Sequence, residues 1–196
     1  MYTWGYIKEN TLSKLNIGEE EANQLGFLSR FTYYANEAMT QICSAIKPDE
    51  KRFTIEITDK DVNKELMMPD DFIAFSDDVV YCIEDMRYGD TLYTEIGDEI
   101  LTYRGYNKFI CHAIGKYEIP YKARWFFFTK ELHNSTVIPA PADICDALPS
   151  YIASQCFKID DETKAAIYRN EYEMFLSRID DTSFKSQRTF HIGGGW

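Results

Sequence analysis

Apolar residues in the first part of the chain recur at every third or fourth position, which is the spacing of one face of an α-helix. The members of this stripe are Phe27, Phe31, Tyr34, Ala38, Ile42 and Ala45. Asn16 followed by Glu19 resembles a capping box, in which two side chains satisfy the first free N–H groups of a helix. Lys47-Pro48 marks the end, because the residue before proline is disfavoured in the α region. The pattern predicts one long helix from about Glu19 to Ile46.

Between Arg52 and about Thr129 the apolar spacing changes to two, which is typical of half-buried strands. Near the start of this region, Phe53, Ile55 and Ile57 alternate with polar residues. Four glycines lie eight to ten residues apart, as expected for short antiparallel strands joined by hairpins: Gly89, Gly97, Gly105 and Gly115. The region therefore predicts a β-rich insertion, folded as a meander or small barrel of about five to seven strands.

After a loop marked by Pro139 and Pro141, the apolar spacing becomes helical again. The first stripe is Ile144, Leu148, Tyr151, Ile152 and Cys156. Pro149 lies inside this stripe and should kink the helix or make it start again. The second stripe is Ala165, Tyr168, Tyr172, Phe175 and Ile179. Asp160 is the expected N-cap of its helix, so the two stripes predict a C-terminal helical pair.

Both ends of the chain contain aromatic residues outside any periodic pattern. The sequence ends in Phe190-His191-Ile192-Gly193-Gly194-Gly195-Trp196, which is too short and too rich in glycine to fold alone, so it must be disordered or docked on something. Tyrosine and tryptophan are enriched in protein interfaces, where an apolar body meets a polar rim. The candidate intersubunit contacts are therefore Tyr2, Trp4, Phe190, Ile192 and Trp196. For Trp4 and Trp196, burial against the protein's own body is expected about as much as an anchor role in a neighbouring subunit.

Together the elements predict an α+β fold in four parts. Residues 1–50 and 131–180 form the two portions of one helical bundle, and residues 51–130 form a β-rich insertion between them. Residues 181–196 form an extended segment that docks on a neighbouring subunit. A chain of 196 residues can bury a substantial core without disulfide bonds.

The charge balance narrows the classes of partner. The chain carries 21 basic and 32 acidic residues, a net charge of −11, which disfavours stable binding to the phosphate backbone of nucleic acids. Its five cysteines are odd in number and scattered, so free thiols in a reducing compartment are expected. We find neither a signal-peptide pattern nor an apolar run long enough to span a membrane, and we expect no membrane association.

The sequence is poor in catalytic motifs. It has no phosphate-binding loop, dinucleotide fingerprint or serine nucleophile elbow, and its histidines, His112, His133 and His191, have no evident partner base or nucleophile. Cys111 and His112 should point to opposite faces of a strand, which disfavours a shared zinc ion. Acidic pairs between Asp70 and Asp85 could gather divalent cations, but we favour their interpretation as solubilising acids in turns and at strand ends, because acidic residues are abundant throughout the chain. We expect no catalytic residue, cofactor or metal, and no enzyme.

The last two predicted helices carry a recognisable pattern. It consists of Leu148-Pro149-x-Tyr151-Ile152-Ala153-Ser154, then Asp160-Asp161, Lys164-Ala165, Tyr168, Tyr172-Glu173 and Leu176. Two further motifs precede it, Ala35-Asn36-Glu37-Ala38-Met39 with Ile42 and Tyr117-x-Ile119-x-Tyr121. In order and character these elements resemble the head-to-tail connector proteins of tailed phages, also called adaptor, neck or ring proteins, from about Leu12 to Ile179. The resemblance also suggests a phage of the crAss-like type.

The resemblance implies a connector-type helical bundle with an antiparallel β-rich insertion, and a structural virion protein. Such proteins form a homo-oligomeric ring, commonly a dodecamer, with the portal protein above and tail ring or hub proteins below. The ring continues the DNA channel, and an acidic ring lets DNA pass transiently without stable binding. The implied location is the neck or tail of a virion assembled in the cytoplasm of a host bacterium. Another tail or baseplate ring component, a metal-dependent phosphodiesterase and a bacterial interaction module remain as alternatives.

Overall fold

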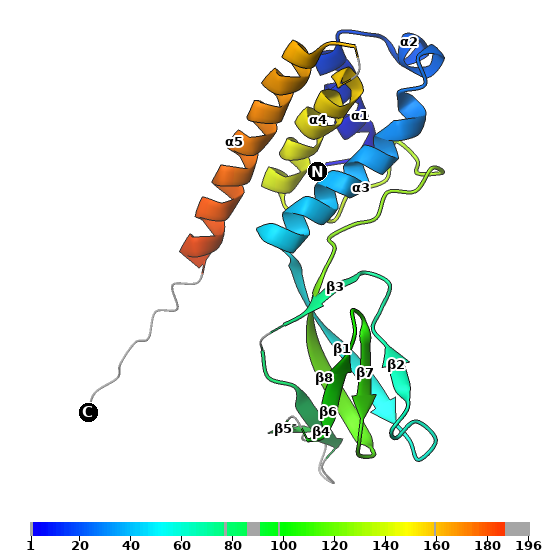
Figure 1. The fold of residues 1–196 in the computed structure, drawn as a ribbon, viewed down its shortest axis with the longest axis vertical. Coiled ribbons are helices and arrows are strands. Elements are labelled where there is room, and N and C mark those ends of the chain that lie inside the picture. The colour runs from blue at the N-terminus through cyan, green and yellow to red at the C-terminus, as the bar shows by residue number, and fades with distance from the viewer. Residues whose placement is uncertain (1, 77, 86–90, 98, 159, 187–196) are drawn as a thin grey trace, which may run out of the picture. The chain divides into compact units, whose positions relative to one another are not determined.

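The computed structural model describes residues 2–76, 78–85, 91–97, 99–158 and 160–186. The chain divides into two compact units (Figure 1). The helical unit comprises Met1–Lys47 and Trp125–Trp196, and the β unit comprises Pro48–Arg124. The predicted α+β fold class is confirmed, because helices and antiparallel sheets are both present. No helix in the described ranges is both long and apolar enough to cross a membrane.

Helix α4 is the centre of the helical unit. The helices are α1 (Trp4–Leu15), α2 (Glu19–Gln24), α3 (Leu28–Ala45), α4 (Ala142–Phe157) and α5 (Glu162–Ser186). Three of them, α1, α3 and α5, pack against α4. The side chains of α4 are buried on every side, as Ile144, Leu148 and Ile152 illustrate with 0% exposure. A helix that is apolar all round belongs in a core, so α4 organises the unit.

The N-terminal part contains three helices, so the prediction of one helix over Glu19–Ile46 is wrong. Two left-handed residues cause the breaks, Asn16 with φ 56° and Gly26 with φ 71°. At each break two backbone N–H groups donate to carbonyls of the preceding helix. At the first break these are the N–H groups of Asn16 and Ile17. This arrangement is the Schellman motif, which ends helices. Asn16 therefore closes α1 instead of capping the next helix, whose N-cap is Gly18.

Two predictions about the C-terminal helices also need correction. Helix α4 continues through Pro149 without a second start, because packing on three sides holds it where an isolated helix would break. The side chain that caps α5 is Asp161 and not Asp160: its Oδ1 accepts the Lys164 backbone N–H at 3.0 Å, and this bond lowers the pKa of Asp161. Helix α5 reaches Ser186, so residues 181–186 of the predicted extended segment are helical.

The N-terminal residues are fixed by the segment that precedes α4. Thr3 forms an isolated antiparallel bridge with Val137, and the Gly5 N–H donates to the Asn134 carbonyl at 2.8 Å. A Cβ at Gly5 would lie 3.0 Å from that carbonyl oxygen, so glycine permits the close approach. This pairing directs Trp4 into the interior of the helical unit, where it is 3% exposed.

The β unit contains two antiparallel sheets. Its described strands are β1 (Asp49–Ile57), β2 (Glu65–Met67), β3 (Phe72–Phe75), β4 (Tyr81–Asp85), β5 (Thr91–Glu95), β6 (Leu101–Arg104), β7 (Lys108–Cys111) and β8 (Gly115–Ala123). One sheet has the order β1-β8-β4-β5, with β3 also pairing β8, and the other has the order β2-β7-β6. Strand β8 pairs with β1 along its whole length, from Asp49↔Ala123 to Ile57↔Gly115. The prediction of a meander or a small barrel is therefore wrong, because the described strands form two separate sheets.

The core of the β unit contains side chains from both sheets. Phe109 of the second sheet and Ile119 of the first are both fully buried, and Tyr117 is 2% exposed. The hydroxyl of Tyr117 donates to the Ala113 carbonyl at 3.1 Å, so its polar end is satisfied where the chain turns into β8. The expected alternation of inward and outward residues is present along β1.

Thiol labelling should separate the opening of the two units. Burial raises the pKa of Cys111 to about 11 and those of Cys145 and Cys156 to about 12, so near pH 8 these thiols are protonated as well as inaccessible. We expect a maleimide to label half-buried Cys82 first, then Cys111 when the β unit opens and Cys145 and Cys156 when the helical unit opens. Mass spectrometry of labelled peptides across a urea series measures the order. Equal labelling of all five thiols without urea would contradict this prediction.

Candidate interaction surface

Helix α3 bears a recess, here called the α3–Phe127 groove, on its outer side. It is lined by Tyr33, Asn36, Glu37, Thr40 and Gln41 from α3 and by Phe127 from the chain that precedes α4. The recess encloses about 430 Å³, within the range of about 300–1,000 Å³ usual for binding pockets. Tyr33 and Phe127 are 66% and 56% exposed. Large aromatic side chains exposed beside a recess are characteristic of protein-binding surfaces.

Asn36 fixes the Phe127 side of this groove. Its amide nitrogen donates to the Phe128 carbonyl at 2.8 Å, and its amide oxygen accepts the Phe128 N–H, also at 2.8 Å. The Phe128 ring is buried against Trp4 and Phe126, with ring centroids 5.2 and 5.0 Å away. Because Phe128 is held both through its backbone and through its ring, the neighbouring Phe127 is presented at the surface in a fixed position.

The other side of the groove combines polar groups with a carboxylate. The Gln41 amide donates to the Tyr151 hydroxyl at 3.0 Å, and Glu37 also lies close to that hydroxyl. Burial raises the pKa of Tyr151 to about 12, and Glu37 adds to the rise. The Tyr151 hydroxyl is thus a neutral donor at physiological pH, and Glu37 contributes a negative charge to a groove with aromatic walls.

Substituting Asn36 should loosen this wall. Asn36→Ala leaves both backbone groups of Phe128 without their side-chain partner, and we expect a loss of about 1–3 kcal/mol in the free energy of unfolding. Asn36→Asp keeps an acceptor for the Phe128 N–H but brings a carboxylate oxygen against the Phe128 carbonyl, so it should also destabilise the protein. Urea titration followed by circular dichroism measures both. An Asn36→Ala protein as stable as the parent would show that the two bonds contribute nothing.

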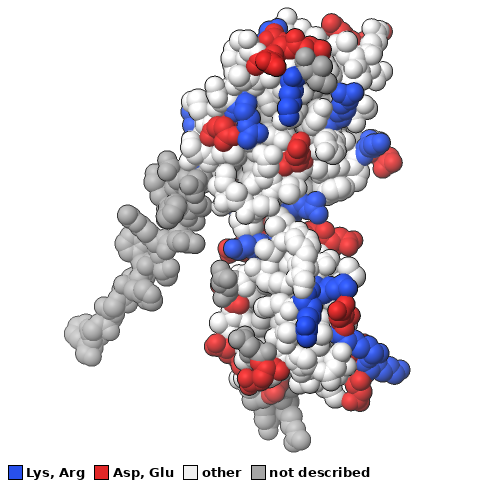
Figure 2. All heavy atoms as spheres, viewed as in Figure 1, with Lys and Arg blue, Asp and Glu red and all other residues white. Residues whose placement is uncertain are grey.

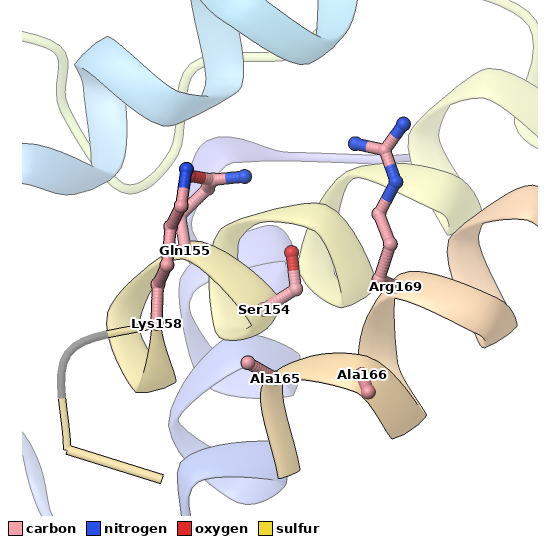
Figure 3. A pocket seen from close by; sticks show the side chains of 6 residues that line it. All are labelled: Ser154, Gln155, Lys158, Ala165, Ala166 and Arg169. Atoms are coloured by element: carbon pink, nitrogen blue, oxygen red, sulfur yellow. The ribbon is translucent and has the colours of Figure 1, made fainter. Parts of the chain in front are cut away.

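A second recess lies between α4 and α5 (Figure 3). Ser154, Gln155 and Lys158 line it from α4, and Ala165, Ala166 and Arg169 line it from α5, around about 330 Å³. Its cationic Arg169 is already engaged, because it forms an ion pair with Glu173 and its guanidinium lies 5.2 Å from the Tyr172 ring centroid. The Ser154 hydroxyl donates to the Tyr151 carbonyl within its own helix. These groups complete the contact of the two helices and leave little unused binding capacity.

The predicted contact residues have different surroundings. Trp4 is buried in its own helical unit, so it has little surface to offer a second subunit, because the start of the chain folds into α1 instead of an aperiodic arm. Tyr2 is half-buried: its hydroxyl donates to Asp146 at 2.9 Å, and that bond is the main cause that raises its pKa to about 12. Phe190, Ile192 and Trp196 lie outside the described residues.

Sequence reasoning missed the α3–Phe127 groove. Tyr33 is the residue before Tyr34, which is a member of the apolar stripe, and Phe127 lies in the run Trp125–Phe128. Both were therefore visible in the sequence as aromatic residues. The missing information was the pairing of Asn36 with Phe128, which joins residues far apart in the sequence. The sequence signal that was available is the polar residue Asn36 within the helical stripe, together with the aromatic run Trp125–Phe128.

The groups considered for chemistry have structural partners. The two ring nitrogens of His112 lie 2.7 Å from the Asn63 amide oxygen and 3.0 Å from the Thr102 hydroxyl. Asp71 accepts bonds from Lys51 and Tyr121. Within the described ranges, no three His, Cys, Asp or Glu residues form a group that could hold a metal ion. Asp77 and the side chain of Asp85 lie outside the described residues.

Charge is unevenly distributed over the helical unit. Figure 2 shows acidic side chains gathered near α2, whose first turn consists of Glu19, Glu20 and Glu21. These carboxylates face the positive end of their own helix dipole. Elsewhere on the same face, Lys and Arg alternate with Asp and Glu (Figure 2), and ion pairs such as Lys14–Glu171 at 2.8 Å and Lys47–Asp143 at 2.9 Å neutralise them locally.

Comparison with known proteins finds a likeness among solved structures. No protein-family model and no curated protein matches the sequence. Among solved structures, the chain matches one described as "Neck of empty GTA particle computed with C6 symmetry", at 14% identity and a TM-score of 0.34, over 100% of this chain and 96% of that chain. A likeness at this TM-score carries no argument about function, and nothing in it is specific to crAss-like phages. The proposal below therefore depends on the residues of the chain itself.

Proposed function

We propose that copies of this chain assemble into a closed, dodecameric ring at the junction of portal and tail in a tailed-phage virion. The ring joins the portal protein to the tail ring or hub proteins and continues the channel for DNA. The sequence resemblance of the helices to connector proteins supports this proposal. The observation that carries it is the presence of large exposed apolar side chains on both units of the chain.

These side chains fit a subunit with several neighbours. On the helical unit they include Tyr33, Phe127, Ile167 and Met174, which are 56–66% exposed, and on the β unit Met67, Tyr93, Tyr106 and Ile114, which are 52–71% exposed. A ring that closes by rotation joins each copy head to tail, so each copy needs two different complementary surfaces. We assign one such surface to the exposed apolar side chains of each unit.

The proposed role needs no catalysis, cofactor or membrane. Each copy carries a net charge of −11, so a ring repels the phosphate backbone of the DNA that passes through it. DNA then crosses the ring transiently and does not remain attached. Contacts between copies come in part from the C-terminal segment, defined as residues 187–196, whose Phe190, Ile192 and Trp196 offset the entropy lost on ordering.

The test is the position and stoichiometry of the chain in purified particles. Electron cryomicroscopy should show a closed ring directly below the portal, and size-exclusion light scattering on the free protein gives its state before assembly. A ring at a lower position would make the chain a tail or baseplate component. Absence from particles, with a stable monomer in solution, would overturn the proposal.

A further inference from the structure

The α3–Phe127 groove is a built site whose occupant remains to be assigned. Asn36 fixes its Phe127 wall through two 2.8 Å bonds, and the Tyr33 ring packs edge-on against Tyr34 with centroids 5.7 Å apart. Both walls therefore keep their positions without a ligand. Aromatic surface held ready in this way reduces the entropy lost on binding, which favours an apolar partner.

The charge of the groove selects among possible partners. Glu37 supplies a carboxylate, while the chain as a whole is strongly acidic and would be repelled. The sequence from 182 to 196 contains Lys185 and Arg188 but neither Asp nor Glu; unlike the acid-free stretch 100–117, which forms strands of the β unit, most of it lies outside the described residues. The same stretch holds three aromatic residues, Phe184, Phe190 and Trp196. It therefore combines the positive charge and the apolar side chains that the groove would accept.

Helix α5 is longer than the helix it packs against. Helices α4 and α5 are joined by a short turn, and α5 has 25 residues against 16 in α4. At 1.5 Å per residue, the last turns of α5 extend past the start of α4 (Figure 1). The last described side chain of α5 that is buried is Ile179. In sequence, the C-terminal segment follows directly on this end of α5.

We propose that the C-terminal segment of one copy binds in the α3–Phe127 groove of a second copy. Aromatic and aliphatic side chains of the segment lie between Tyr33 and Phe127, and Arg188 lies near Glu37. The contact is head to tail, since the donor surface and the acceptor surface differ. This inference rests on the proposed ring, for which it names the acceptor of the C-terminal segment.

Peptide binding to the full chain tests the acceptor. A fluorescein-labelled peptide of residues 187–196 should bind saturably in an anisotropy titration. The double variant Tyr33→Ala, Phe127→Ala should weaken binding about tenfold or more, and Glu37→Gln should weaken it less and reduce its salt dependence. The matched control Tyr106→Ala, Ile167→Ala removes two side chains that are 71% and 57% exposed elsewhere and should leave the affinity unchanged. No binding, or equal weakening by the control, overturns the proposal.

Cross-linking tests whether the contact joins two copies. One full chain carries Thr40→Cys, at an exposed position that lines the groove, a second carries Gly193→Cys, and the two are mixed under mild oxidation. A disulfide-linked dimer should form in the mixture and be absent from either protein alone, which also controls for native Cys82. If no disulfide-linked dimer forms in the mixture, the proposal is wrong. A ring in particles whose C-terminal segments bind elsewhere would contradict this inference alone, whereas absence of the chain from particles would contradict the proposed function.

Discussion

Replacing Trp4 with alanine should lower the free energy of unfolding of the helical unit by about 3–5 kcal/mol. Trp4 is 3% exposed, and its ring lies 5.2 Å from that of Phe128. Its backbone N–H donates to the Thr136 carbonyl at 2.9 Å, a bond that alanine would keep. Removing the indole leaves a cavity at the point where the start of the chain, the segment before α4 and the Phe128 ring meet. Urea unfolding followed by circular dichroism measures the change.

A neighbouring substitution provides the control. Tyr6 lies on the same helix, is 43% exposed, and Tyr6→Ala should change the stability by less than about 1 kcal/mol. Trp4→Phe keeps part of the apolar contact and should be intermediate. If Trp4→Ala were no more destabilising than Tyr6→Ala, Trp4 would not be a core residue, and a role in contacts between copies would again be open.

Deleting residues 189–196 should leave a folded protein but reduce its incorporation into particles by about tenfold or more. The deleted stretch contains Phe190, Ile192 and Trp196, and aromatic anchors of this kind commonly contribute 2 kcal/mol or more to an interface. The described helices and strands of both units all lie before residue 189, so the deletion removes none of their residues. Quantitative mass spectrometry of purified particles measures incorporation.

Two controls accompany the deletion. A variant with Trp196→Phe keeps an aromatic ring and should retain most of the incorporation. Far-ultraviolet circular dichroism of the free deletion variant should match that of the full chain, which excludes misfolding as the cause. Normal particle assembly and infectivity with the deletion would show that the C-terminal segment has no role in the ring.

Local signals predicted the helices well where packing and propensity agree. The stripe Ala165–Ile179 lies on α5, and its inward residues Tyr172 and Ile179 are fully buried. The α3 stripe was right in its middle, at Phe31, Ala38 and Ile42, each with 0% exposure. The stripe begins at Phe27, after both breaks, so it could not show that Asn16 and Gly26 adopt left-handed conformations that end α1 and α2.

Contacts between distant residues were beyond the reach of sequence patterns. The β region was recognised by its period of two, but the central position of β8 depends on its pairing with β1, β3 and β4, which no local spacing encodes. The sequence showed no periodic pattern around Trp4, so it could not decide between burial and contact with a neighbour; the burial depends on the backbone pairing of Thr3 with Val137. The α3–Phe127 groove likewise depends on a pair more than ninety residues apart, Asn36 and Phe128.

The pairing of β1 with β8 has a consequence for the order of folding. The helical unit is discontinuous in sequence, so α3 can meet α4 only after the chain closes a loop that spans Pro48–Arg124. Closing a flexible loop of that length costs roughly 4 kcal/mol in entropy. The antiparallel ladder that begins at Asp49↔Ala123, with the Trp125 indole N–H donating to the Lys47 carbonyl at 2.9 Å, brings the two ends together in advance. Folding of the inserted sheet should therefore precede assembly of the helical unit, whose helices come before and after it in the sequence, and should accelerate that assembly.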